Sequence, residues 1–171
     1  MTRFAFDSPT LLWAEAIGRP GQRVFYLHAG QDREWVRVRI EKFQLQQLAD
    51  AIDELLAEAG RRFNPPEEDA APAAEGPPVP PASDLEAGQM SIGYDPSDDR
   101  ISLTVSEPGA ADDAPPVLEC RPSRGQVRAL SRRIAELVAA GRPLCPVCEQ
   151  PMDPDGHRCL RRNGHEAGGL G

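Results

Sequence analysis

Three cysteines and a histidine near the C-terminus are the residues best suited to chemistry in this sequence. Cys145 and Cys148 form a C-x-x-C pair, and His157 and Cys159 follow after eight intervening residues. Zinc prefers four tetrahedral ligands drawn from cysteine thiolates and histidine nitrogens. The intervening run Asp153-Pro154-Asp155-Gly156 is rich in turn formers and can reverse the chain. We therefore predict that these four residues bind one structural zinc ion.

Two other interpretations of these cysteines stay open, a redox dithiol and a set of unliganded thiols. A redox C-x-x-C pair usually opens a helix, whereas Cys145 and Cys148 follow a predicted one. A catalytic zinc ion is disfavoured because four protein ligands leave no position for water. The remaining cysteine, Cys120, is interpreted as a core residue.

Two further groups could hold a ligand, and each has a structural alternative that we favour. Gly18 and Gly21 would let a backbone approach a ligand closely, with Arg23 binding an anion, but a hairpin turn explains the same residues. His28 and Glu15 would form an acid–base pair if their strands are neighbours, although a lone strand histidine is usually structural. The sequence has no nucleophile-elbow, Walker, dinucleotide or H-E-x-x-H motif.

Arginines are concentrated in the second predicted helix and around the zinc segment. Arg124, Arg128 and Arg132 fall at i, i+4 and i+8 on one helical stripe, and Arg161 and Arg162 follow the cysteines. We interpret the stripe as a solvated helix face, with a surface for an acidic partner or RNA as the alternative. The net charge of −8 and pI near 4.9 argue against a general binder of nucleic acid or anionic membrane.

Hydrophobic periodicity predicts the elements that position these residues. Alternating or apolar runs indicate strands at 11–17, 23–29, 35–40, 89–94, 100–106 and 117–121. One helix follows the first three strands and ends near Gly60. A second follows the last three, begins at a capping-box signature formed by Ser123 and Gln126, and runs to about Ala140.

The two halves match in order and in detail. A shift of 82 positions places Gln44, Leu48 and Ile52 on Gln126, Leu130 and Ile134. We predict an α+β protein with two β-β-β-α repeats packed as an intramolecular pseudo-dimer, plus a small C-terminal zinc-binding segment. A single unit would expose an unpaired strand edge and a half-covered sheet face, and packing the two units together would bury both. Chance likeness between two amphipathic helices is the alternative.

The expected domain organisation follows from composition. We expect the first unit at 1–63, a Pro-rich flexible linker at 64–85 and the second unit at 86–141. A zinc knuckle at 142–165 and a disordered tail at 166–171 would complete the chain. No leader and no apolar run long enough for a membrane span is present, so we expect a cytoplasmic protein.

Several motifs resemble a known family. The run 18–27 (GRPGQRVFYL), the run 141–148 (GRPLCPVC) and the run 153–159 (DPDGHRC) are similar to the actinobacterial domain-of-unknown-function family 3090. The resemblance covers nearly the whole chain. It implies a bacterial cytoplasmic protein with no established activity, and it supplies no catalytic residues.

The function that these observations favour is a non-enzymatic zinc-binding interaction or scaffold protein with an unidentified protein partner. The first alternative is a nucleic-acid-associated protein that uses the Arg-rich second helix and the zinc knuckle. The second alternative is an enzyme with a cleft between the repeats.

Overall fold

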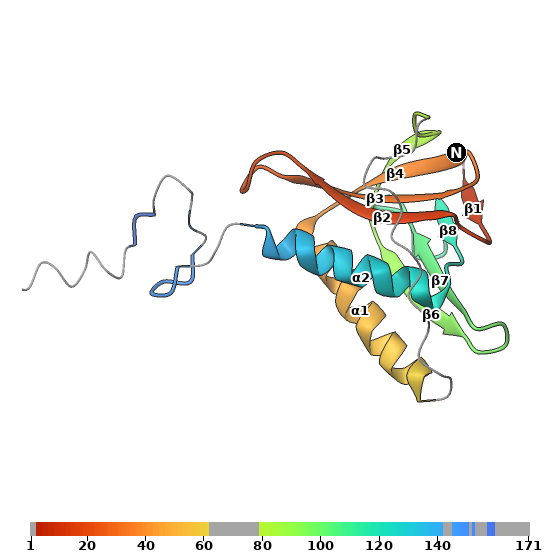
Figure 1. Cartoon of the computed structure of the whole chain (residues 1–171). Helices are drawn as coiled ribbons and strands as arrows, with labels where there is room; N and C mark the ends of the chain where they lie inside the picture. The colour runs from red at the N-terminus through yellow and green to blue at the C-terminus, as the bar shows by residue number, and fades with distance from the viewer. Residues whose placement is uncertain (1–2, 62–78, 142–144, 151, 153–156, 160–171) are drawn as a thin grey trace, which may run out of the picture.

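The computed structural model describes residues 3–61, 79–141, 145–150, 152 and 157–159. Its mixed composition of two sheets and two helices confirms the predicted α+β class (Figure 1). The elements in chain order are β1 (Phe4–Phe6), β2 (Leu11–Ile17), β3 (Val24–Gln31), β4 (Glu34–Ile40), α1 (Lys42–Gly60), β5 (Ser83–Glu86), β6 (Met90–Asp95), β7 (Arg100–Val105), β8 (Leu118–Cys120) and α2 (Arg124–Ala139).

Each four-stranded sheet combines three strands from one half of the chain with one strand from the other. The sheet orders are β2-β3-β4-β5 and β1-β8-β7-β6. Within each sheet the three consecutive strands pair antiparallel, whereas β5 pairs parallel with β4 and β1 pairs parallel with β8. The two halves therefore exchange their first strands.

The sequence patterns predicted three strands in each half, and the structure has four. β1 has only three residues, Phe4 to Phe6, too few to display a period. β5 has the sequence SDLE, with Asp84 and Glu86 exposed at a sheet edge, so its apolar signal is weak. The linker predicted at 64–85 is too long, because residues 83–85 belong to this strand. Its residues 64–78 lie outside the described residues.

The apolar faces of both sheets and both helices form one core. Leu27, Val36, Val38, Ile101 and Leu103 are fully buried in it. The helices α1 and α2 pack against each other, and each also packs against the first meander strand of the other half: α1 on β6 and α2 on β2. Within the described residues no helix has the combination of length and apolar character that crossing a bilayer requires.

Each helix has a glutamine in its first turn, Gln44 in α1 and Gln126 in α2, whose side chain links the helix cap to the other half. The predicted box at α2 is confirmed, since the Gln126 backbone N–H donates to Ser123 Oγ (3.1 Å) and the Ser123 backbone N–H donates to Gln126 Oε1 (2.9 Å). At α1 the Glu41 N–H donates to Gln44 Oε1 (2.9 Å). The Gln126 side chain also donates through Nε2 to the Pro9 carbonyl (2.6 Å). In the same way, Gln44 Nε2 donates to the Gly88 carbonyl (2.8 Å). Each helix start is thus joined to the loop that follows the other half's exchanged strand.

Shortening the connection between α1 and β5 should change stability little. Deleting about ten residues from the Pro-rich run within 64–77 alters only loop-closure entropy, which varies slowly with length. The deletion leaves Val79, whose carbonyl accepts a hydrogen bond from Trp35 Nε1 (2.8 Å). We expect the midpoint of urea denaturation to stay close to that of the full chain. A large decrease in the midpoint would mean that the deleted residues contribute packing.

Candidate metal centre and the other predicted sites

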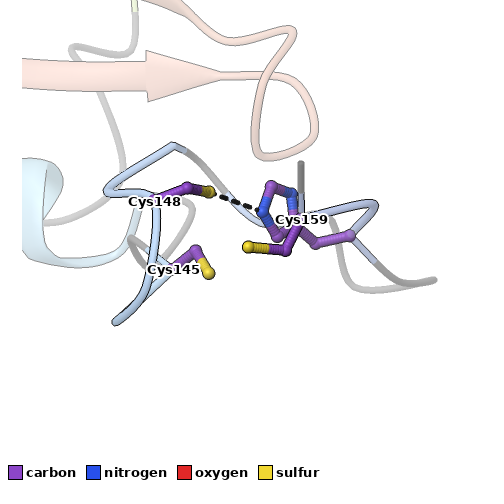
Figure 2. Close-up of side chains that lie close together, drawn as sticks. Cys145, Cys148 and Cys159 are labelled. Carbon is purple, nitrogen blue, oxygen red and sulfur yellow. Dashed lines mark hydrogen bonds between the residues drawn. The ribbon is translucent and has the colours of Figure 1, made fainter. Parts of the chain in front are cut away.

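The four predicted zinc ligands lie together in the structure. The sulfur atoms of Cys145, Cys148 and Cys159 and a ring nitrogen of His157 all lie within 4.8 Å of one another. Cys148 Sγ is 3.0 Å from His157 Nε2, and the side chains point toward a common centre (Figure 2). The convergence predicted from the spacing is confirmed, and the arrangement is compatible with a single metal site.

A tight turn presents the first two sulfur atoms on the same side. The Glu149 N–H donates to the Cys145 carbonyl (2.8 Å), and the Cys145 N–H donates to the Gln150 carbonyl (2.8 Å). Glu149, which follows Cys148 in this turn, has a left-handed backbone conformation with φ of 58°. That conformation is uncommon for a residue with a side chain, so the rest of the turn must hold it in place.

Backbone N–H groups around the turn act on the charge of the thiols. Hydrogen bonds from the N–H of Cys148 and then of Val147 lower the pKa of Cys145 to about 6. The Gln150 N–H acts in the same direction on Cys148, but burial and the neighbouring thiols of Cys145 and Cys159 leave the pKa of Cys148 raised. The lowered pKa of Cys145 favours its thiolate, the form that binds metal ions.

Cys120 lies in β8 and is not part of this cluster. Its side chain belongs to the common core and is 1% exposed. Burial alone raises the pKa of its thiol to about 12, so it stays protonated at physiological pH. The structure agrees with its interpretation as a core residue.

The Gly18–Arg23 segment is the turn of the β2–β3 hairpin. Gly18 and Gly21 have φ of 112° and 90°, and a Cβ at Gly18 would lie 2.6 Å from the Gln22 carbonyl oxygen. Arg23 Nη2 donates to the Leu137 carbonyl (2.8 Å) in the last turn of α2, where a cation is favourable. Arg23 thus fixes the end of α2, and the hairpin alternative accounts for all three residues.

His28 and Glu15 face each other from adjacent strands, as their spacing in the predicted hairpin allows. His28 Nε2 is 3.4 Å from Glu15 Oε2, and the histidine is 5% exposed. In the described part of the chain this nitrogen has no hydrogen-bond partner. Burial lowers the pKa of His28, an effect that Glu15 partly offsets and Arg37 reinforces.

The lowered pKa of His28 makes a pH-dependent contribution to stability. When pH falls through 6.5, the unfolded chain takes up a proton that the folded His28 resists, so the free energy of unfolding should decrease. Replacing His28 with glutamine should flatten this decrease between about pH 7.5 and 5.5. Urea denaturation at about pH 7.5 and at about pH 5.5 measures this change in the free energy of unfolding. An unchanged pH slope in His28→Gln would contradict the assignment.

The predicted arginine stripe is divided between two different environments. Arg124 has a side chain only 10% exposed and forms a two-pronged ion pair with Asp99, through Nε–Oδ1 (2.7 Å) and Nη2–Oδ2 (3.0 Å). The buried and paired side chain of Arg124 differs from the solvated helix face that was predicted for the stripe. Arg128 and Arg132 instead border a groove between α1 and α2. Arg161 and Arg162 lie outside the described residues.

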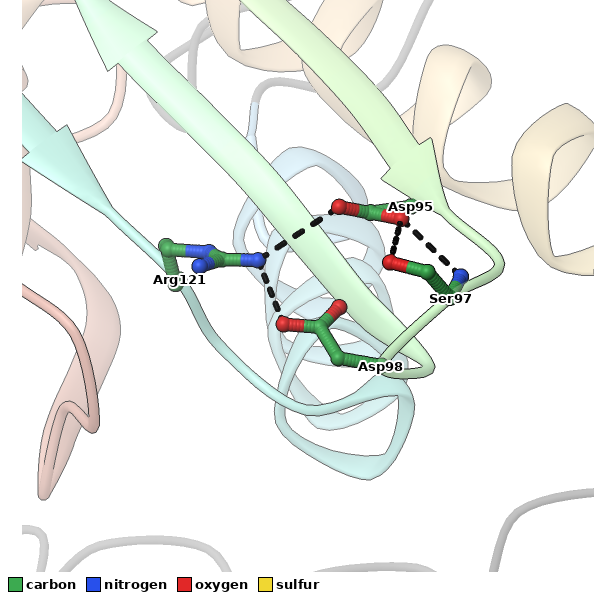
Figure 3. Close-up of polar contacts among 4 residues, drawn as sticks. All are labelled: Asp95, Ser97, Asp98 and Arg121. Atoms are coloured by element: carbon green, nitrogen blue, oxygen red, sulfur yellow. Dashed lines mark hydrogen bonds and ion pairs between the residues drawn. The ribbon is translucent and has the colours of Figure 1, made fainter.

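The partner of Arg124 comes from the acidic β6–β7 turn, which also contacts Arg121 in the connection between β8 and α2. Arg121 Nη2 lies 2.5 Å from Asp98 Oδ2 and 3.7 Å from Asp95 Oδ2 (Figure 3). Asp95 also accepts hydrogen bonds from the Ser97 hydroxyl (2.6 Å) and N–H (2.9 Å), which lower its pKa. The strands predicted at 89–94 and 100–106 leave room for this turn, but the sequence analysis did not predict its ion pairs with Arg121 and Arg124.

Comparison with known proteins identifies a family but no activity. No curated protein and no solved structure matches the chain. The family described as proteins of unknown function, DUF3090, matches residues 4–159. This match includes both sheets, both helices and all four clustered metal-ligand candidates. The chain therefore belongs to the DUF3090 family.

Proposed function

We propose that this protein is a non-enzymatic interaction protein whose C-terminal segment is held rigid by one structural zinc ion. The convergence of three sulfur atoms and an imidazole nitrogen within 4.8 Å carries the proposal. Four protein ligands would fill the tetrahedral positions of zinc and leave none for water. Backbone N–H groups that donate to Cys145 favour its thiolate, in keeping with a role as a metal ligand.

The zinc segment offers an apolar side chain to a partner. Val147, in the turn between Cys145 and Cys148, is 46% exposed. A bound ion would fix this turn, so Val147 would bind an apolar pocket without losing much conformational freedom. We therefore propose a protein partner. Nucleic acid is less favoured because the chain carries a net charge of −8 and Arg124 is paired with Asp99.

The test compares partners retained by the wild-type chain and by Val147→Asp. Tagged proteins of equal zinc content are purified from their native cells, with nuclease treatment in one arm. We expect Val147→Asp to lose a protein that the wild type retains with or without nuclease. The same partner on both proteins would exclude this surface, and loss of the partner after nuclease treatment would support the nucleic-acid alternative.

An electrophoretic titration with RNA and DNA addresses that alternative directly. A nucleic-acid-associated protein would retard either polymer with an affinity that falls steeply as salt increases. We expect no retardation at physiological salt. A saturable shift that weakens in Arg128→Ala would contradict the proposed protein partner.

We further propose that the two halves are repeats packed as a pseudo-dimer. Each half has the order β-β-β-β-α and gives its first strand to the other half's sheet. The exchanged strands have equivalent registers, with Val36 opposite Ser83 and Leu118 opposite Phe4. The cap glutamines Gln44 and Gln126 make equivalent contacts. These correspondences support a duplicated unit that later acquired the zinc segment.

A further inference from the structure

A groove lies between α1 and α2, separate from the clustered cysteines. It has a volume of about 490 Å³. Residues at helical spacing on both helices line it, among them Asp53, Leu56 and Ala57 on α1 and Arg128, Ser131 and Arg132 on α2. Its size falls in the range of small-molecule sites, which are mainly apolar with a few placed polar groups.

We propose that this groove binds a small organic anion. Its phosphate or carboxylate would lie against Arg128 and Arg132, and its apolar part would lie on the floor of the groove. The proposal does not depend on the zinc segment or on the protein partner proposed above.

The charges around the groove favour an anion on the side formed by α2. Arg128 and Arg132 are one turn apart on α2, and the planar guanidinium group suits phosphate and carboxylate oxygens. Asp53, on α1, accepts a hydrogen bond from the buried Ser131 hydroxyl (2.7 Å). This bond holds the carboxylate at the α2 interface, where it would accept a hydrogen bond from a hydroxyl or amino group of the ligand.

The floor of the groove favours an organic anion over a bare ion. Leu56 is half-buried, while Ala57 and Ala135 are exposed with small side chains that leave space above them. Among the described residues, none has an atom within 4 Å of a Cβ added at Gly60, so none of them closes this end of the groove. An inorganic ion would contact only the arginines, whereas a ligand with an apolar body would also cover this surface.

The test is a titration of the full zinc-loaded chain with phenyl phosphate, followed by amide chemical shifts. We expect saturable shifts confined to residues 53–60 and 128–135, and affinity about fivefold or more above that for inorganic phosphate because the ring buries apolar surface. Arg128→Ala should weaken binding about tenfold. Arg33→Ala removes the same charge from the exposed β3–β4 turn and should leave binding unchanged.

A second pair of variants tests the floor without changing charge. Ala57→Phe should fill the groove and abolish binding, whereas Ala139→Phe, at an exposed position of α2, should not. Unperturbed spectra elsewhere establish that each variant is folded. Equal weakening by Arg33→Ala and Arg128→Ala, equal affinity for inorganic and phenyl phosphate, retained binding in Ala57→Phe, or no saturable shifts would each overturn the proposal.

Discussion

The Cys148→Ser protein should be purified with far less than one zinc ion per chain. Cys148 supplies one of four converging ligand atoms and lies 3.0 Å from another, so its loss leaves an incomplete set. Metal binding of this kind is coupled to local folding, with apparent free energies on the order of 10 kcal/mol in small zinc modules. We expect the residues around the ligands, 145–150 and 157–159, to lose their arrangement while the sheets and helices stay folded.

Elemental analysis measures the loss of zinc, and amide spectra measure the loss of local conformation. Cys120→Ala is the matched control, because it removes a thiol that lies in the core, and it should retain zinc. Wild-type protein prepared without chelator that contains no zinc would refute the metal assignment. Equal zinc content in Cys148→Ser and the wild type would exclude Cys148 as a ligand.

Ile52→Ala and Ile134→Ala should each decrease the free energy of unfolding by about 2–5 kcal/mol. Both side chains are fully buried in the common core, one from α1 and the other from α2. Truncation leaves a cavity that neither helix can close, since each is held by the other helix and by a strand of the opposite half. Urea denaturation measures both losses.

Phe43→Ala is the control for loss of apolar volume alone. Phe43 is 60% exposed in the first turn of α1, so its truncation should change stability by about 0.5 kcal/mol or less. Similar losses at Ile52 and Ile134 are expected if the two helices are equivalent. A large loss at one isoleucine and almost none at the other would contradict both the shared core and the proposed repeat.

Local hydrophobic patterns were sufficient to predict the strands in the central part of each half. Alternation in 35–40 predicted β4, observed at Glu34–Ile40, because one face of this strand is buried and the other is polar. The exchanged strands were not predictable in this way. β1 is too short and β5 too polar, and what stabilises them is pairing with a strand more than forty residues away.

The candidate sites could likewise be predicted where their residues are close in the sequence, and not where they depend on contacts between distant segments. The four candidate metal ligands lie within fifteen consecutive residues, so spacing and turn composition alone predicted their convergence. The environment of Arg124 depends on Asp99, which helical periodicity cannot reveal. The groove beside Arg128 exists because small residues of α1 and α2 meet there, and that contact is a property of the packed helices.

The exchange of first strands has a consequence for synthesis on the ribosome. Phe4 pairs with Leu118, so the N-terminal strand has no partner in its own sheet until residues near position 120 have left the exit tunnel. β4 likewise lacks its parallel neighbour until Ser83–Glu86 have emerged. Unpaired strand edges are prone to aggregation, and contacts between distant residues form slowly. The nascent chain therefore carries the Phe-Ala-Phe segment of β1 unpaired until Leu118–Cys120 have emerged, whereas the sheet that contains β4 is completed earlier, by Ser83–Glu86.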